Sequence, residues 1–294
     1  MKVIITGSNG LLGQKLVSYC IAHSIDFVAT SKGDNRNQDC PESKFQSLDI
    51  TVEGDVIQLF EKLKPSHVIH TAAMTNVDAC EENPEECNLI NVKATEYVVL
   101  ACNQINAHFQ LLSTDFVFDG LKGNYNEEDD ANPLSEYARS KVDAEIITKE
   151  ISTTSWSIVR TIIVYGHGNN LSRSNIVVWA KGALEKGDPL KIVDDQFRAP
   201  TFADDLAAGC MAVILKSKQG IYHVSGPETL SIYEIVARIG KHFNYNTAGI
   251  EKISSSTLNQ AAIRPPKTGF DLSKAYEDLD YQPHTLEESL SVMF

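Results

Sequence analysis

The chain has 294 residues, 43% of them hydrophobic, which is enough for the core of one large domain or two closely packed ones. It has 26 lysines and arginines and 39 aspartates and glutamates, which give a net charge of -13. This charge disfavours nucleic acid as a partner because a negative surface repels phosphate. The six cysteines form no CxxC pair and the longest apolar run is about half a membrane span. We therefore expect reduced thiols, no metal site, no membrane contact and a cytoplasmic location.

Strand and helix patterns alternate over the first half of the chain. Short apolar runs ending at glycine or polar residues predict strands, and apolar residues at helical spacing predict helices. This rhythm predicts an α/β fold, a doubly wound parallel sheet of the Rossmann type with helices on both faces. The expected strands are 2–6, 26–30, 44–49, 67–73, 108–114 and 156–166, and the expected helices are 11–23, 55–64, 84–105 and 134–149.

The regular alternation of strand and helix patterns ends at Gly166. We expect residues 166–294 to form mainly a smaller C-terminal α/β lobe for the substrate, with a segment at about 202–224 returning to the main sheet. Residues 194–201 read as irregular. The expected helices of this half are 176–186, 202–217 and 231–243, with a last one inside 261–279, and the expected strand is 220–226.

A glycine-rich turn, TGSNGLLG, joins the first strand to the first helix. At this position backbone N–H groups can bind a pyrophosphate. Gly7 would make the tight turn, Gly10 would admit the phosphate and Gly13 would let the helix approach the sheet, with Leu11 and Leu12 beside them. A turn without any ligand is the alternative.

The end of the second strand indicates which dinucleotide binds. An acidic residue there would hold a ribose 2′-hydroxyl, but the chain has Ser31 and Lys32, with Arg36 close by. A hydroxyl and two cations suit a 2′-phosphate, so NADP(H) is favoured over NAD(H), which stays open, and residues 1–165 are the predicted NADP(H)-binding domain. Asp49, followed by Ile50, would accept from the adenine amino group or would cap the next helix.

Tyr137 and Lys141 lie one helical turn apart, so they share a face. Reduction of a ketone needs a proton donor, and a free tyrosine has a pKa of about 10. We expect Lys141 to make Tyr137 more acidic, and Thr114 to donate a second hydrogen bond to the substrate oxygen. The alternative is that Tyr137 packs and Lys141 is solvated.

The chain resembles the extended short-chain dehydrogenases/reductases, and among them the dTDP-4-dehydrorhamnose reductases. The resemblance rests on TGSNGLLG, HTAAMTNVDACE, STDFVFDG, YARSK, VRTIIVYG, DDQFRAPTFADDLA, GIYHVSG and RPPKTGFDLSK, which together span the chain. It implies a catalytic set of Thr114, Tyr137 and Lys141, and it places Val77 and Asp115 near the sugar. It also implies that the cofactor contacts Ala72, Ala73, Met74, Thr75, Tyr137 and Lys141.

The chain departs from this family at two places. Ile163 stands where these reductases usually have a tryptophan that contacts the sugar, and Arg198 stands where they usually have glycine. In related enzymes basic residues near Arg198 and Arg264 hold the diphosphate of a nucleotide-sugar; the alternative for each is a surface pair with a carboxylate. His67 and His70 are expected in core or surface roles rather than as metal ligands.

The resemblance implies an NADPH-dependent oxidoreductase that reduces the C4 keto group of a nucleotide-linked 6-deoxy sugar, with dTDP-4-dehydrorhamnose as the first candidate. Two alternatives stay open. One is another nucleotide-sugar reductase or epimerase on the same scaffold. The other is a non-catalytic NADP-binding subunit like the regulatory β subunit of methionine adenosyltransferase. The oligomeric state, a homodimer included, also stays open.

Overall fold

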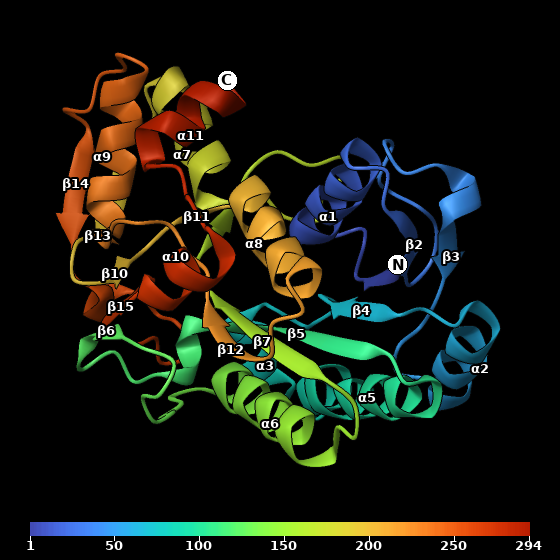
Figure 1. Cartoon of the computed structure of the whole chain (residues 1–294). Coiled ribbons are helices and arrows are strands. Elements are labelled where there is room, and N and C mark those ends of the chain that lie inside the picture. The colour runs from blue at the N-terminus through green and yellow to red at the C-terminus, as the bar shows by residue number, and fades with distance from the viewer.

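A seven-stranded parallel sheet forms the centre of the computed structural model, which describes residues 1–294 (Figure 1). The strands run in the order β12-β7-β5-β4-β1-β2-β3, so the chain winds outward in one direction from β1 and in the other from β4. The predicted doubly wound α/β fold is confirmed. Its strands are β1 (Lys2–Thr6), β2 (Asp26–Ser31), β3 (Phe45–Ser47), β4 (His67–His70), β5 (His108–Thr114), β7 (Trp156–Thr161) and β12 (Gly220–His223).

Helices cover both faces of this sheet because neighbouring strand residues point to opposite faces. In β1, for example, Val3 and Ile5 enter one hydrophobic core while Ile4 enters the other. The first core is covered by α1 (Leu11–Ala22), α8 (Ala203–Leu215) and α10 (Ser273–Leu279), and the second by α2 (Glu53–Leu63), α5 (Ala94–Ile105) and α6 (Glu136–Ile151) (Figure 1).

The single helix expected over 84–105 is interrupted. Two short helices, α3 (Val77–Glu82) and α4 (Pro84–Asn88), lead into a π-helical turn, Leu89–Lys93, before α5 begins. The turn directs the buried Asn91 side chain inward, where it donates to the Met74 carbonyl (3.0 Å) and to Ser140 Oγ (2.9 Å). It thereby ties the segment after β4 to α6. A 3.6-residue pattern does not reveal such an insertion.

The strand expected over 156–166 is also interrupted, which corrects that prediction. β7 ends at Thr161, and β8 (Val164–Tyr165) leaves the main sheet to pair with β11 (Thr201–Phe202). Thr201 stabilises the break, since its N–H donates to the Ile163 carbonyl (3.2 Å) and its hydroxyl to the Ile162 carbonyl (2.5 Å). Ile163 takes a φ of 33°, a left-handed conformation that a β-branched residue adopts only under tertiary constraint.

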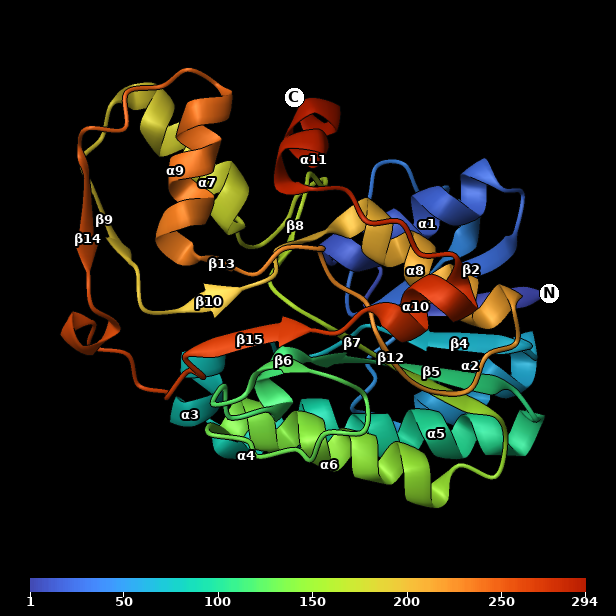
Figure 2. The same ribbon diagram turned by 60° about the vertical axis from the view of Figure 1, so that its left-hand side comes forward.

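A smaller lobe of short strands and three helices stands beside the sheet (Figure 2). The segment expected to be irregular, 194–201, contains β10 (Phe197–Arg198) and the first residue of β11. The sequence did not predict these strands because a strand of two residues leaves no periodic signal. The lobe core gathers Tyr165, Phe202, Ile235, Ile239 and Leu290. The lobe elements are β6 (Gly123–Tyr125), β9 (Leu190–Val193), β10 (Phe197–Arg198), β13 (Leu230–Ser231), β14 (Ile250–Ile253), β15 (Lys267–Phe270), α7 (Ile176–Lys186), α9 (Ile232–His242) and α11 (Leu286–Met293).

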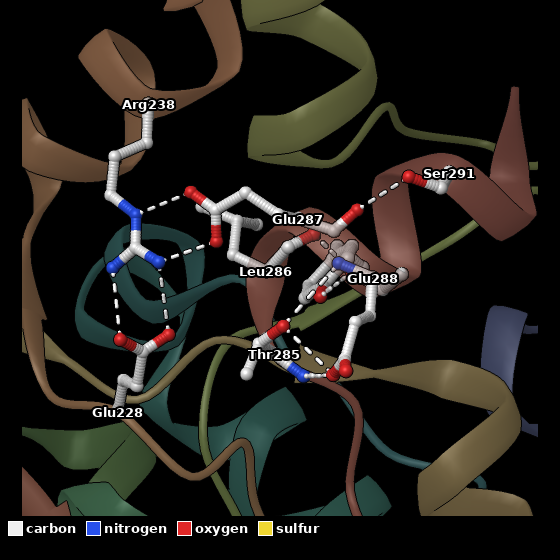
Figure 3. A network of polar contacts seen from close by, with 9 residues as sticks. Glu228, Arg238, Thr285, Leu286, Glu287, Glu288 and Ser291 are labelled. Carbon is white, nitrogen blue, oxygen red and sulfur yellow. Dashed lines mark hydrogen bonds and ion pairs between the residues drawn. The ribbon is translucent and has the colours of Figure 1, made fainter. Parts of the chain in front are cut away.

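The last helix, α11, lies beyond the segment where the final helix was expected. Its start carries a capping box, in which Thr285 and Glu288 satisfy each other's backbone N–H groups. Arg238 of α9 then holds the helix in place by pairing with both Glu228 and Glu287 (Figure 3). The TxxE signature of the box was the available sequence signal. No helix of the chain is long and apolar enough to cross a membrane.

Candidate active site

A cleft of ≈ 680 Å³ lies at the carboxyl ends of the sheet strands, where the strand order reverses between β1 and β4. It brings together most of the predicted site residues, and it leaves out Met74, Arg198 and Arg264. The predicted residues that line it are Gly7, Gly10, Leu11, Leu12, Gly13, Ser31, Lys32, Asp49, Ile50, Ala72, Ala73, Thr75, Val77, Thr114, Asp115, Tyr137, Lys141 and Ile163.

The glycine-rich turn has the shape that a pyrophosphate requires. Gly7 has a φ of 69°, and a β-carbon there would lie 2.7 Å from the Ala72 nitrogen. A β-carbon on Gly13 would lie 2.4 Å from the Gly7 carbonyl oxygen, so only glycine lets α1 approach the turn. Gly10 caps α1 without a side-chain hydrogen bond, and the first turn of the helix carries no acidic residue. Its N–H groups therefore remain available to an anion, and the turn fits a dinucleotide diphosphate.

An exposed ion pair marks the far end of the cleft. Lys32, whose side chain is 79% exposed, lies 2.7 Å from Asp49, and this contact lowers the pKa of Asp49 to about 2. Asp49 also accepts from the Thr51 N–H (3.0 Å) and hydroxyl (2.7 Å). It does not cap α2, because that helix begins at Glu53 with Val52 as its cap. Arg36 lines the same end, so two cations and Ser31 stand where an adenosine ribose phosphate would lie.

The phenol and ammonium of α6 are both buried, so the alternative of a solvated Lys141 is wrong. Ser135 caps α6 by accepting from the Ala138 N–H (3.3 Å), and this sets the start of the helix and the direction of its first turns. Tyr137 is 9% exposed and Lys141 4% exposed. Burial lowers the pKa of Lys141 to about 8, against an opposing influence of Glu145. The ammonium therefore remains mostly charged at neutral pH.

Tyr137 is not more acidic than a free tyrosine in this structure, which corrects the expectation from the spacing. Burial raises the pKa of Tyr137 well above its ordinary value, and the Thr114 side chain only partly opposes that shift. The physical reason is that a phenolate without water is costly, even near an ammonium. The phenol is protonated at neutral pH, and this is the form that a proton donor needs at the start of a reduction.

Thr114 and Asp115 stand at the end of β5, where the chain enters a single 3-10 turn, Asp115–Val117. The Thr114 hydroxyl accepts from the Phe116 N–H (3.2 Å) and donates to Asp115 Oδ1 (3.1 Å). Asp115 is 2% exposed and also accepts from the Thr268 hydroxyl. Thus the hydrogen of the predicted hydroxyl donor is directed to a buried carboxylate in this structure.

Neither predicted arginine lines the cleft. Arg198 is 2% exposed and lies 3.7 Å from Asp115, so its predicted surface alternative is wrong, and no cleft opening reaches its guanidinium for the predicted diphosphate contact. Arg264 pairs with Asp78 (2.6 Å), which corresponds to the predicted alternative of a carboxylate partner. The physical reason is that the Pro265 and Pro266 carbonyls accept from the Arg198 guanidinium inside the protein, while Asp78 binds that of Arg264.

Several residues that line the cleft were not predicted. Arg173, from the polar loop before α7, reaches the cleft and donates to Thr75 Oγ1 (2.9 Å), and the Phe116 ring lies edge-on to Tyr137. A lone arginine in a polar loop was the sequence signal for Arg173. Met74 instead packs with Cys80, Cys87 and Tyr137 below the cleft.

The histidines occupy ordinary structural positions. His70 is buried, with Nδ1 2.8 Å from the Thr6 hydroxyl and Nε2 3.4 Å from the Thr95 hydroxyl, which confirms the core role predicted for it. Burial lowers the pKa of His70 to about 3, so the ring is neutral. His67 lies at the start of β4 and contacts the Ser66 hydroxyl (2.9 Å).

The family model described as the RmlD substrate binding domain matches residues 1–294. The chain is similar to dTDP-4-dehydrorhamnose reductase of Aggregatibacter actinomycetemcomitans, 28% identical over 98% of this chain and 97% of that protein. It is also similar to methionine adenosyltransferase 2 subunit beta of Xenopus laevis, 28% identical over 93% of this chain and 81% of that protein. Among solved structures, dTDP-4-dehydrorhamnose reductase of Bacillus anthracis in complex with NADP has a TM-score of 0.87 at 28% identity, covering 100% of this chain and 98% of that one.

Proposed function

Because the chain belongs to the RmlD substrate binding domain family, as its resemblance predicts, we propose that it reduces the C4 keto group of a nucleotide-linked 6-deoxy sugar with NADPH. It is an NAD(P)-dependent oxidoreductase that acts on a nucleotide-sugar. The observation that carries the proposal is the convergence of Thr114, Tyr137 and Lys141 in the cleft that opens at the glycine-rich turn. dTDP-4-dehydrorhamnose is the first candidate substrate.

The three side chains have separate roles in this reaction. NADPH, when bound, supplies the hydride for the carbonyl carbon. Tyr137, protonated at neutral pH, gives its proton to the oxygen that becomes an alkoxide. The charged Lys141, one turn away, stabilises the phenolate that Tyr137 becomes. Thr114 contributes a hydroxyl to the same oxygen. Its one hydrogen is donated to Asp115 (3.1 Å) in this structure, so it turns from Asp115 to the substrate oxygen when the sugar binds.

The cofactor preference rests on charge at the adenosine end of the cleft. Lys32 and Arg36 suit a 2′-phosphate, and no carboxylate stands at the end of β2 to bind a free ribose hydroxyl in its place. Asp49 is already paired with Lys32. NADPH is therefore the proposed cofactor, and NADH remains a weaker one.

The residues at the sugar end of the cleft support the class of substrate, a nucleotide-sugar, better than they support the identity of the sugar. Arg173 is the cation that lines the cleft there, so we assign the substrate diphosphate to Arg173 rather than to Arg198 or Arg264. Ile163 offers an aliphatic surface where the reductases that the chain resembles usually place an aromatic ring. Another 4-keto sugar would therefore fit the same chemistry.

A second candidate function follows from the similarity to methionine adenosyltransferase 2 subunit beta. A regulatory subunit would bind the dinucleotide without turning over a sugar. The buried and complete set of Thr114, Tyr137 and Lys141 favours catalysis.

The deciding experiment is an NADPH oxidation assay with a panel of nucleotide-linked 4-keto sugars. We expect oxidation with at least one 4-keto-6-deoxy sugar, and oxidation slower by roughly 10²- to 10⁴-fold with Tyr137→Phe. NADPH binding, measured separately by fluorescence titration, is the control for folding. A chain that binds NADPH tightly and oxidises it with no member of the panel would instead support the regulatory role.

A further inference from the structure

The loop of residues 166–175 joins β8 to α7 and crosses from the lobe toward α1 (Figure 1). It contains no helix or strand, and residues 167–174 are all exposed or partly buried, so no buried side chain of their own fixes this part of the loop. Two of these residues, Ser172 and Arg173, nevertheless line the cleft. The position of Arg173 therefore depends on the contacts that the loop makes with its neighbours.

The buried side chain of Gln14 makes the shortest of these contacts. Gln14 follows Gly13 near the start of α1 and is 3% exposed. Its Nε2 donates to the Asn169 carbonyl (2.7 Å), and its Oε1 accepts from the Asn169 N–H (2.7 Å). Nε2 also donates to the Asn9 carbonyl (3.1 Å) in the glycine-rich turn. Both hydrogens and the oxygen of this amide are thus used, and they join the backbone of the loop to the turn.

A second set of bonds joins the loop to the segment that follows β2. The Asn170 side chain donates to the Arg36 carbonyl (3.2 Å). Asn9, 2% exposed, holds the same segment, since its side chain accepts from the Arg36 N–H (2.8 Å) and donates to the Asp34 carbonyl (2.9 Å). The loop is therefore bonded to both parts of the chain to which we assign the dinucleotide, the glycine turn and the segment that carries Arg36.

Gly168 allows the Gln14 amide to approach the loop. A β-carbon on Gly168 would lie 2.9 Å from Gln14 Oε1 and 3.1 Å from the Leu171 side chain. The backbone of Gly168 is not in the left-handed region, so these contacts are what require a glycine there. The loop and α1 are thus matched to each other at this point.

We propose that Gln14 is a positioning residue for the substrate: it fixes the loop so that Arg173 faces the diphosphate of the nucleotide-sugar, and it thereby couples the binding of that ligand to the binding of the dinucleotide. A dinucleotide on the glycine turn restricts the same backbone that Gln14 bonds. The loop is then already ordered when the second ligand arrives, and that ligand loses less conformational entropy. The inference rests on the proposed function, which assigns the diphosphate to Arg173.

The test measures binding rather than turnover. The probe is the tightest binder among dTDP, UDP, GDP and CDP, and calorimetry gives its Kd with and without saturating NADP+. We expect NADP+ to lower this Kd by about fivefold or more in the parent chain, and the probe to lower the Kd of NADP+ by the same factor, because coupling is reciprocal. A parent chain that binds none of the four, or binds one without coupling, would overturn the inference.

Gln14→Leu should abolish the coupling, so that the Kd of the probe is the same with and without NADP+. A Gln14 that only stabilises the fold would weaken both Kd values and leave their ratio at the parental value, and this result would overturn the inference. Gln58→Leu, at an exposed position of α2, is the matched control and should keep the parental ratio.

Two variants of the loop test the same contact from its other side. Gly168→Ala should reduce the coupling without touching α1, so it decides the matter if urea unfolding shows that Gln14→Leu is misfolded. Asn169→Ala should keep most of the coupling, because Gln14 bonds the backbone of Asn169 while the side chain contacts only Asp39 (3.1 Å). Parental coupling in Gly168→Ala, or none in Asn169→Ala, would contradict the role of Gln14.

Arg173→Met tests the end of the chain of contacts. It should raise the Kd of the probe in the presence of NADP+ by about 10- to 150-fold, the contribution of a charge-assisted hydrogen bond, and leave little for NADP+ to enhance. An unchanged Kd would remove Arg173 from the diphosphate and overturn the inference.

Hydrogen exchange provides a readout that needs no probe. Because the Asn169 N–H donates to Gln14 Oε1, NADP+ should slow exchange of a peptide covering residues 167–175 in the parent but not in Gln14→Leu. Equal slowing in both would contradict the inference. The turnover assay with 4-keto sugars separates the two levels. A chain that shows coupling without turnover keeps the inference and loses the proposed reduction, whereas a chain that reduces a sugar without coupling keeps the function and loses the inference.

Discussion

The two ends of the cleft are built by different means. At the dinucleotide end the shape comes from backbone, a glycine turn and the first turn of α1, and the charges such as Lys32 are exposed. At the other end, which we propose is the catalytic end, the charges are buried: Lys141 and Asp115 line the cleft, Arg198 lies outside it beside Asp115, and each is at most 4% exposed. The dinucleotide end therefore depends on steric fit, and the other end depends on the ion pairs and hydrogen bonds that stabilise buried charges. Substitutions at the two ends should therefore impair the protein in different ways.

The largest expected effect is at the catalytic end, with Tyr137→Phe. The change removes the proton donor and leaves the ring packed, so kcat should fall by roughly 10²- to 10⁴-fold. NADPH affinity should stay within a few-fold, because the glycine turn is untouched. Steady-state oxidation and fluorescence titration measure the two quantities. A near-parental kcat would show that the proton comes from another group.

At the dinucleotide end, Gly13→Ala tests the dependence on shape. The new methyl group would sit 2.4 Å from the Gly7 carbonyl oxygen, so we expect a loss of about 1–3 kcal/mol in the free energy of unfolding and a marked loss of NADPH affinity. Gly182→Ala in α7 is the matched control, since nothing lies within 4 Å of its added atom. That variant should be neutral or slightly more stable. Equal behaviour of the two variants in urea unfolding would refute the packing argument.

His70 is the buried titratable group beneath the dinucleotide end, and it makes that end sensitive to acid. Its pKa of about 3 in the folded chain lies below the unfolded value of about 6.5. The unfolded chain therefore binds the proton more readily, and stability is complete above pH 6.5 and lost as pH falls toward 3. The loss should be about 1.4 kcal/mol for each pH unit in that window.

Urea unfolding at pH 7 and at pH 5 measures this difference. His70→Gln should reduce the pH dependence by that amount, while His23→Gln, at the exposed residue that follows α1, should leave it unchanged. The same slope in both variants would show that other groups cause the acid sensitivity.

The smallest expected effect is at the exposed ion pair. Lys32→Glu removes a partner for the 2′-phosphate and breaks the pair with Asp49, so the ratio of kcat/KM for NADPH to that for NADH should fall. Because Lys32 is largely exposed, we expect a change of about tenfold or less. Lys44→Glu, at an exposed pair outside the cleft, serves as the control. Identical ratios in the two variants would remove Lys32 from the cofactor site.

The sequence predicted the strand, glycine turn and first helix of the dinucleotide end because their signals are local. At the other end, the YxxxK spacing likewise placed Tyr137 and Lys141 on one face of a helix, α6. The catalytic end escaped prediction where it depends on distant partners. Arg198, on the two-residue strand β10, donates to the Pro265 carbonyl and lies 3.7 Å from Asp115, and the Thr201 hydroxyl bonds the chain directly after β7. The inserted turn at Asn91 likewise has no periodic signature.

The order of the lobe segments along the chain also governs how the protein can be synthesised. The lobe sheet takes β6 from residues 123–125 and β15 from residues 267–270, and Arg238 clamps a helix that ends at residue 293. On the ribosome, the strands up to β7 can pair as they emerge, but β7 keeps an open edge until β12 is made, and the lobe closes only with the last helix. We therefore expect folding to begin at the dinucleotide end, and the lobe beside the other end to be complete only after translation of nearly the whole chain.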